Sequence, residues 1–165
     1  MKTLQIRWQR LVNEQGETCD RCGMTEAAVT AAVHQLKQAL QGLGIDVTVS
    51  KEALSSAEFH EGPLESNRIW IGNKPLEQWL SATTGQSRCC AACGNADCRT
   101  LTVDGQTFEA IPVELIIRAG LMAAAELLQN SSGETCCEPE APEPSSGGCC
   151  PAPSAAVGCG KAGGS

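Results

Sequence analysis

Large apolar side chains become rare after Leu128, so any hydrophobic core has to form from the part of the chain before it. Residues 130–165 consist mainly of Gly, Pro, Ser, Ala and Cys, which cannot bury enough surface to offset the entropy lost on ordering. The remaining length is typical of a single domain. We therefore expect one globular domain over residues 1–129 and a disordered, Cys/Pro/Gly-rich tail over residues 130–165.

The first half of the globular part alternates between strand and helix patterns. Apolar and polar residues alternate over residues 3–12, which predicts a half-buried strand. Thr25 is a suitable N-cap for a helix that runs to about Gln41. A second strand is predicted at residues 45–50, and residues 51–58 are predicted as a short helix or irregular structure.

The second half of the globular part is predicted to contain two hairpins and a final helix. In chain order the predicted elements are a strand at 68–71, a turn at 72–73, a helical turn at 76–80, a hairpin of strands 100–103 and 106–109 around the turn 104–105, and a helix that Pro112 opens and that runs to Leu128.

Charge excludes several classes of function. The net charge of −7 argues against a general nucleic-acid binder, because binding phosphates requires clustered Lys and Arg. The longest apolar stretch, residues 111–128, carries Glu114, Arg118 and Glu126, which are costly in lipid, so we expect no membrane insertion. Residues 1–10 lack the apolar run of a signal peptide, and we expect a cytoplasmic protein.

The chain has eleven cysteines, an unusually high number for its length. In a reducing cytoplasm they are more typical of metal ligands or redox thiols than of a disulfide scaffold. The odd count agrees with this interpretation, because a closed disulfide framework requires an even number.

Cys19 and Cys22 form a CxxC pair between the first predicted strand and helix. Two intervening residues allow both sulfur atoms to meet at a helix start, where backbone N–H groups stabilise a thiolate, and Arg21 adds positive charge. The pair is predicted as the catalytic or ion-transferring site. The alternative is half of a zinc site that other cysteines complete.

A second group of cysteines lies in a predicted insertion at about residues 86–99. Cys89, Cys90, Cys93 and Cys98 can hold a tetrahedral zinc ion or another thiophilic ion. Adjacent cysteines rarely bind one ion together, so Cys90, Cys93 and Cys98 with one of Cys89, Cys19 or Cys22 is an equal alternative. An iron–sulfur cluster is disfavoured by the tight spacing.

Five more cysteines lie in the predicted tail, namely Cys136, Cys137, Cys149, Cys150 and Cys159. Vicinal thiols suit ions that accept two or three sulfur ligands, such as arsenite or mercuric ion. An ideal coil of this length spans about 30 Å, enough to reach a folded domain. The tail is therefore predicted to bind metal, with neutral expansion of a Gly/Cys sequence as the alternative.

The order strand, helix, strand, hairpin, helix, with a CxxC after the first strand, resembles the thioredoxin-like superfamily over residues 1–128. Residues 67–77 (NRIWIGNKPLE) resemble the hairpin of its small members. More narrowly, the chain is similar to an uncharacterised bacterial thioredoxin-like family with CxRC near the N-terminus and a downstream cysteine cluster. The resemblance implies an α/β fold with a mixed sheet of four to six strands flanked by helices. Classical members carry a cis-proline facing the CxxC, and here Ser66 and Asn67 occupy that place.

These features predict a thioredoxin-like protein that binds or transfers thiophilic ions (arsenite, mercuric or zinc) through cysteine thiolates. The tail resembles the vicinal-cysteine ends of arsenic metallochaperones, which makes a membrane exporter a candidate recipient. One alternative is a dithiol–disulfide oxidoreductase in which Cys19 attacks a partner's disulfide and Cys22 resolves the intermediate. Another is an adaptor with a structural zinc ion.

Overall fold

The computed structural model describes residues 1–89, 93 and 95–130. The chain separates into two units, Met1–Glu134 and Thr135–Ser165, and all of the described residues belong to the first. Apart from Asn130, the predicted tail therefore lies outside the described residues.

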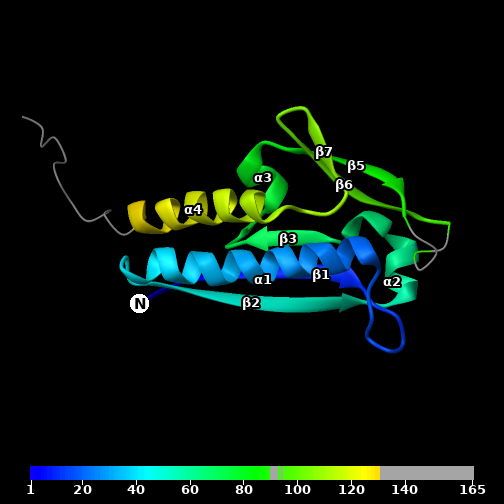
Figure 1. Cartoon of the computed structure of the whole chain (residues 1–165), viewed down its shortest axis with the longest axis horizontal. Coiled ribbons are helices and arrows are strands. Elements are labelled where there is room, and N and C mark those ends of the chain that lie inside the picture. The colour runs from blue at the N-terminus through cyan, green and yellow to red at the C-terminus, as the bar shows by residue number, and fades with distance from the viewer. Residues whose placement is uncertain (90–92, 94, 131–165) are drawn as a thin grey trace, which may run out of the picture. The chain divides into compact units, whose positions relative to one another are not determined.

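A four-stranded mixed sheet forms the centre of the first unit, in the order β2-β1-β3-β4 (Figure 1). β1 (Lys2–Leu11) runs parallel to β2 (Ile45–Leu54) and antiparallel to β3 (Arg68–Ile71), which pairs with the short β4 (Lys74–Pro75). The crossover between β1 and β2 contains α1 (Asp20–Gln41), as a parallel pair requires.

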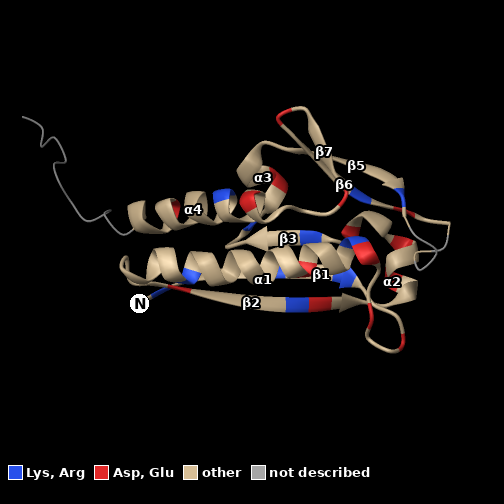
Figure 2. Ribbon diagram, in the orientation of Figure 1, with Lys and Arg blue, Asp and Glu red and all other residues tan. Residues whose placement is uncertain are grey.

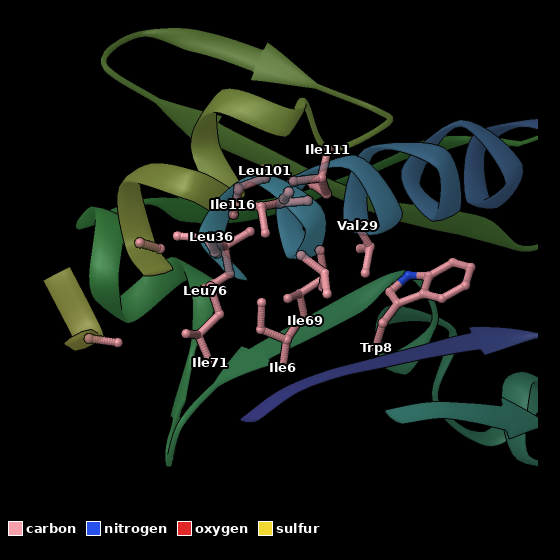
Figure 3. Packing of buried hydrophobic residues seen from close by; sticks show 14 of the residues in the cluster. Ile6, Trp8, Val29, Leu36, Ile69, Ile71, Leu76, Leu101, Ile111 and Ile116 are labelled. Carbon is pink, nitrogen blue, oxygen red and sulfur yellow. The ribbon is translucent and has the colours of Figure 1, made fainter. Parts of the chain in front are cut away.

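The two long helices, α1 and α4 (Val113–Gln129), pack against each other and against the apolar side of this sheet. Alternate residues of β1, such as Ile6 and Trp8, are fully buried beneath them (Figure 3). Gly120 permits the close approach of the helices, because a Cβ atom there would lie 2.5 Å from Cδ1 of Leu36. Among the described residues, no helix has both the length and the apolar character needed to cross a membrane.

A second sheet, three-stranded and antiparallel, lies between α3 (Leu76–Leu80) and α4 in the sequence. It consists of β5 (Thr83–Arg88), β6 (Asp97–Val103) and β7 (Gln106–Phe108). Arg99 of β6 is buried and donates to Glu77 of α3 at 2.6 Å and to the carbonyl oxygen of Leu64 at 3.1 Å. This contact attaches the second sheet to the rest of the unit.

Shorter elements and ion pairs complete the fold. α2 (Ser56–Glu61) and the 3-10 turn η1 (Pro63–Glu65) lead from β2 to β3. Basic and acidic side chains are interspersed over the described elements rather than separated into fields of one sign (Figure 2). Arg7 with Glu52 at 3.3 Å is one example, in which a side chain of β1 pairs with one of β2.

The α/β class and most predicted elements are confirmed. The predicted strand at 68–71 and the helical turn at 76–80 agree with β3 and α3 to the residue. The sheet prediction is confirmed in part, since the strands form separate sheets of four and three. Two predictions were wrong: β2 continues to Leu54 and takes up the start of the segment predicted as helix or irregular, and β5 was not predicted.

The start of the first helix was also predicted wrongly. α1 begins at Asp20, so Thr25 lies inside it rather than at its N-cap. The hydroxyl of Thr25 donates to the carbonyl oxygen of Arg21 at 3.1 Å and accepts the N–H of Ile111 at 3.1 Å. Its role is therefore a contact with a residue 86 positions away, which a local capping rule cannot detect.

Candidate thiol site

The CxxC pair lies at the N-terminus of α1. Cys19 occupies the N-cap position with an extended backbone (φ −72°, ψ 164°), and its side chain makes no capping hydrogen bond. Its carbonyl oxygen accepts the N–H of Gly23 at 2.8 Å, and Cys22 lies in the first helical turn. The partial positive charge of a helix N-terminus favours the thiolate form of a cysteine placed there.

Two further sulfur atoms lie beside Cys19, although they come from the connection between β5 and β6. Sγ of Cys89 is 3.8 Å from Sγ of Cys19, and the thiol of Cys93 donates to Sγ of Cys89 at 3.3 Å. All three sulfur atoms lie within 4.8 Å of one another. Cys19 and Cys93 are buried and Cys89 is partly exposed.

Cys22 and Cys98 extend this group at its two ends. Cys22 hydrogen-bonds to Cys19, and its sulfur atom lies 3.9 Å from Oγ of Ser66. Cys98 of β6 is buried and hydrogen-bonds to Cys93. The structure shows no disulfide bond at the five described cysteines. We call the set Cys19, Cys22, Cys89, Cys93 and Cys98 the thiol cluster.

The thiols of the cluster differ in acidity. The hydrogen bond from Cys22, assisted by hydrogen bonds from Cys89 and Cys93, lowers the pKa of Cys19 to about 5 against the opposing effect of burial. The same hydrogen bond to Cys19, together with burial, raises the pKa of Cys22. Burial and the hydrogen bond with Cys89 raise the pKa of Cys93. Cys19 is therefore a thiolate at neutral pH, and Cys22 and Cys93 are protonated donors.

Arg21, between the two cysteines of the CxxC, connects α1 to the second sheet. Its Nη2 donates to the carbonyl oxygen of Arg88 at 2.6 Å and pairs with the carboxylate of Glu109 at 2.6 Å. The hydroxyl of Ser87 donates to the same carboxylate at 2.8 Å. Since Arg88 directly precedes Cys89, these contacts fix the backbone that presents Cys89 to Cys19.

A cavity of about 190 Å³ opens beside Cys19. The loop between β1 and α1 supplies most of its wall. The lining residues are Leu11, Val12, Asn13, Glu17, Thr18, Cys19 and Ser56. The cavity gives a small molecule or ion a route to the thiolate.

Three cysteines of this cluster have the arrangement of a metal site. Cys19, Cys89 and Cys93 each offer one sulfur ligand. Sequence reasoning treated Cys19 and the 89–98 group mainly as separate sites, with their combination as an alternative. The structure brings members of both groups together, but Cys98 is not one of these three. Cys90, Cys136, Cys137, Cys149, Cys150 and Cys159 lie outside the described residues.

Two contacts at the site have no local signal in the sequence. The pairing of Arg21 with Glu109 joins residues 88 positions apart by number and has no local sequence signal. The approach of Ser66 to Cys22 was indicated only by the thioredoxin-like resemblance, which placed Ser66 and Asn67 opposite the CxxC.

The chain matches a protein family and a protein of known sequence. A family model described as a domain of unknown function (DUF2703) matches residues 4–120, which include the whole thiol cluster. The chain is 40% identical over 113 residues to an uncharacterized protein of Archaeoglobus fulgidus, and this alignment covers 68% of the chain and 82% of the relative. No solved structure matches the chain.

Proposed function

We propose that this chain, which belongs to the DUF2703 family of domains of unknown function, binds thiophilic metal or metalloid ions through Cys19, Cys89 and Cys93. The proposal is inferred from the geometry of the site. The observation that carries the proposal is the convergence of three sulfur atoms within 4.8 Å of one another. Cys19 and Cys89 are 70 positions apart, so the fold itself has to bring them together.

The donor set limits the ions that fit. Thiolates are soft ligands that select soft or borderline ions such as arsenite, mercuric and zinc ions. Three sulfur atoms satisfy an ion that accepts three sulfur ligands in an open geometry. Zinc requires a fourth ligand at the same centre, and the nearby Cys22, Cys98 or a water molecule are the candidates.

The fold supports a relationship to the thioredoxin-like superfamily as part of this proposal. The order β1-α1-β2 followed by β3-β4-α4 agrees with the order of elements on which the resemblance rests, and the mixed sheet β2-β1-β3-β4 agrees with the kind of sheet that it implies. Ser66 lies 3.9 Å from Cys22, as expected for the segment that faces the CxxC. The second sheet and its cysteines are an addition to that plan.

The geometry also supports transfer of the ion, and not only its storage. Cys89 is partly exposed, and Cys19 is reached through the cavity beside it, so a second thiol can approach the bound ion. Exchange then proceeds one sulfur ligand at a time to a partner's thiols, with a membrane exporter as a candidate recipient. The five cysteines of residues 130–165 are a candidate source of incoming thiols within the same chain.

Isothermal titration calorimetry of the reduced full-length chain with arsenite, mercuric chloride and zinc chloride tests the proposal. A variant with Ser at all five cysteines after residue 130 isolates the thiol cluster. We expect it to retain one bound ion, and Cys19→Ser, Cys89→Ser or Cys93→Ser to weaken binding by more than the roughly 10- to 100-fold typical of losing an outer hydrogen-bond partner.

For arsenite and mercuric ions, Cys98→Ser is the matched control, because Cys98 is as buried as Cys93 but lies outside the three ligands. Its effect should stay within that range. Full loss of binding after the five tail substitutions alone would contradict the assignment to Cys19, Cys89 and Cys93. One tightly bound zinc ion that neither a chelator nor a second thiol removes would instead favour a structural zinc adaptor.

A second candidate is dithiol–disulfide exchange by Cys19 and Cys22. The observation that favours it is the hydrogen bond from Cys22, which lowers the pKa of Cys19 to about 5 and so keeps the nucleophile ionised at neutral pH. An insulin-reduction assay tests it. Activity should vanish in Cys19→Ser, and no activity in the reduced wild-type chain removes this candidate.

A further inference from the structure

The sulfur atom of Cys89 lies close to those of both Cys19 and Cys93. It is 3.8 Å from that of Cys19 and 3.3 Å from that of Cys93. A disulfide has an S–S length of about 2.0 Å, so each bond requires the two sulfur atoms to approach by less than roughly 2 Å. Such movements are within the range of side-chain rotation.

We propose that Cys19, Cys89 and Cys93 of the thiol cluster form a disulfide relay, in which an oxidising equivalent received at Cys19 passes to Cys89 and comes to rest as a Cys89–Cys93 disulfide. The relay requires no bound ion. It also differs from two-cysteine exchange, because the thiol that resolves the first intermediate is Cys89, 70 positions away, and not Cys22.

The accessibility of the sulfur atoms gives the relay its direction. Cys19 is the cysteine of the cluster that lines the cavity of about 190 Å³, so we assign the first contact with an incoming disulfide to Cys19. Cys22 is only 3% exposed, and its sulfur atom lies 3.9 Å from Oγ of Ser66. Cys89 is the partly exposed neighbour of Cys19, so it is the thiol assigned to attack a mixed disulfide on Cys19.

The oxidant is a disulfide, for which oxidised glutathione serves as the probe. The sulfur atom of Cys19 attacks it, the incoming S–S bond breaks, and one reduced glutathione leaves. Cys89 then attacks the Cys19 sulfur atom and releases the second reduced glutathione, forming the Cys19–Cys89 disulfide. Cys93 finally attacks Cys89 and releases Cys19.

The atoms and electrons balance over these three steps. Cys89 and Cys93 together lose two electrons and two protons, and the incoming disulfide gains them to become two thiols. The thiol proton of Cys93, which is donated to Cys89 in the reduced chain, is lost to solvent as Cys93 attacks, and Cys19 leaves as the thiolate. Cys19 and Cys22 therefore return to their starting state and can accept a second equivalent.

Peptide mass spectrometry after timed exposure to oxidised glutathione tests the relay. The protein is the full-length reduced chain with Ser at its five cysteines after residue 130, quenched with acid and N-ethylmaleimide. In this chain we expect glutathione on Cys19 first and a Cys89–Cys93 disulfide last. In Cys93→Ser the Cys19–Cys89 disulfide should accumulate to about tenfold its level in the parent chain, because its exit is blocked.

Cys98→Ser controls for the loss of a buried thiol and should leave the sequence of disulfides unchanged. A parent chain that ends as a Cys19–Cys22 disulfide would overturn the relay, as would a folded Cys93→Ser variant in which Cys19 joins only Cys22. The order of products in the parent chain decides the question even where a variant fails to fold. Because the reduced chain is titrated with ions separately, failure of the relay and failure of ion binding are distinguishable.

Discussion

The guanidinium group of Arg21 donates to the carbonyl oxygen of Arg88 at 2.6 Å, although the two residues are 67 positions apart. Arg21 lies between the cysteines of the CxxC, and Arg88 directly precedes Cys89. One hydrogen bond therefore connects the two segments that supply the sulfur atoms, and its ion pair with Glu109 at 2.6 Å reinforces it.

Arg21→Gln should weaken ion binding by about tenfold or more without changing the number of ions bound, because a hydrogen bond from a charged group contributes about 1.5–3 kcal/mol and here holds Cys89 in place. Calorimetric titration with arsenite measures both quantities. Lys51→Gln is the matched control. Lys51 of β2 pairs with Glu26 of α1, the helix that carries Arg21, at 2.6 Å, and this ion pair lies outside the thiol cluster. Equal losses in the two variants would show that Arg21 acts only through general stability.

Alkylation of Cys19 by iodoacetamide should show a midpoint near pH 5, well below that of an ordinary cysteine at about 8.5. The hydrogen bond from Cys22 stabilises the thiolate of Cys19, so Cys22→Ala should move the midpoint upward. Cys22→Ser retains a hydroxyl donor and should move it less. Peptide-resolved mass spectrometry across pH gives each midpoint, and identical profiles for both variants would contradict this assignment of the cause.

Ion binding at the thiol cluster should become stronger as the pH rises from neutral to alkaline values. Cys93 is protonated in the ion-free chain because its pKa is raised, and it has to lose this proton to bind an ion. Cys19 is already ionised above about pH 5, so it adds little to the pH dependence in this range. Titrations in buffers of different ionisation enthalpy should detect proton release, and binding independent of pH would exclude Cys93 as a ligand.

Asn67→Ala should lower the free energy of unfolding by about 2–3 kcal/mol. The side chain of Asn67 accepts the indole N–H of Trp8 at 3.2 Å, and both residues are buried, so the substitution leaves a donor without a partner. Asn67 also has φ +57°, a conformation that alanine adopts poorly. Asn67→Gly also loses the side-chain acceptor, but glycine adopts a positive φ without strain. Its free energy of unfolding, measured by urea denaturation, should therefore lie between those of Asn67→Ala and the wild-type chain.

The elements that follow local rules could be predicted from the sequence. β3 and α3 are bounded by a glycine turn and a proline, and both predictions agree with the structure to the residue. β5 was missed because its sequence TTGQSR has no apolar residue to mark a buried face. β2 extends to Leu54 because every residue of β2 pairs with a residue of β1. The end of β2 therefore depends on the length of β1 and cannot be read from the sequence of β2 alone.

The site could be predicted only in its components. The CxxC before a helix was visible in the sequence, but its position at the N-cap depended on where α1 begins. The meeting of Cys19 with Cys89 and Cys93 depends on how the second sheet packs, for which the contacts of Arg21 and Arg99 are responsible. Neither arginine pairs with a neighbour in sequence, so no spacing rule identifies them.

One of the three sulfur atoms comes from the N-cap of α1, which packs on the four-stranded sheet, and the other two come from the connection between β5 and β6 of the three-stranded sheet. The two sheets share no hydrogen-bonded strand pair. An ion bound by all three sulfur atoms is thus a cross-link between two hydrogen-bonded frameworks. Loading the site should therefore stiffen the junction of the two sheets and raise the melting temperature, with stabilisation that grows with the logarithm of the ion concentration once the site is saturated. A partner protein that contacts the added sheet could distinguish a loaded molecule from an empty one by this change in rigidity alone.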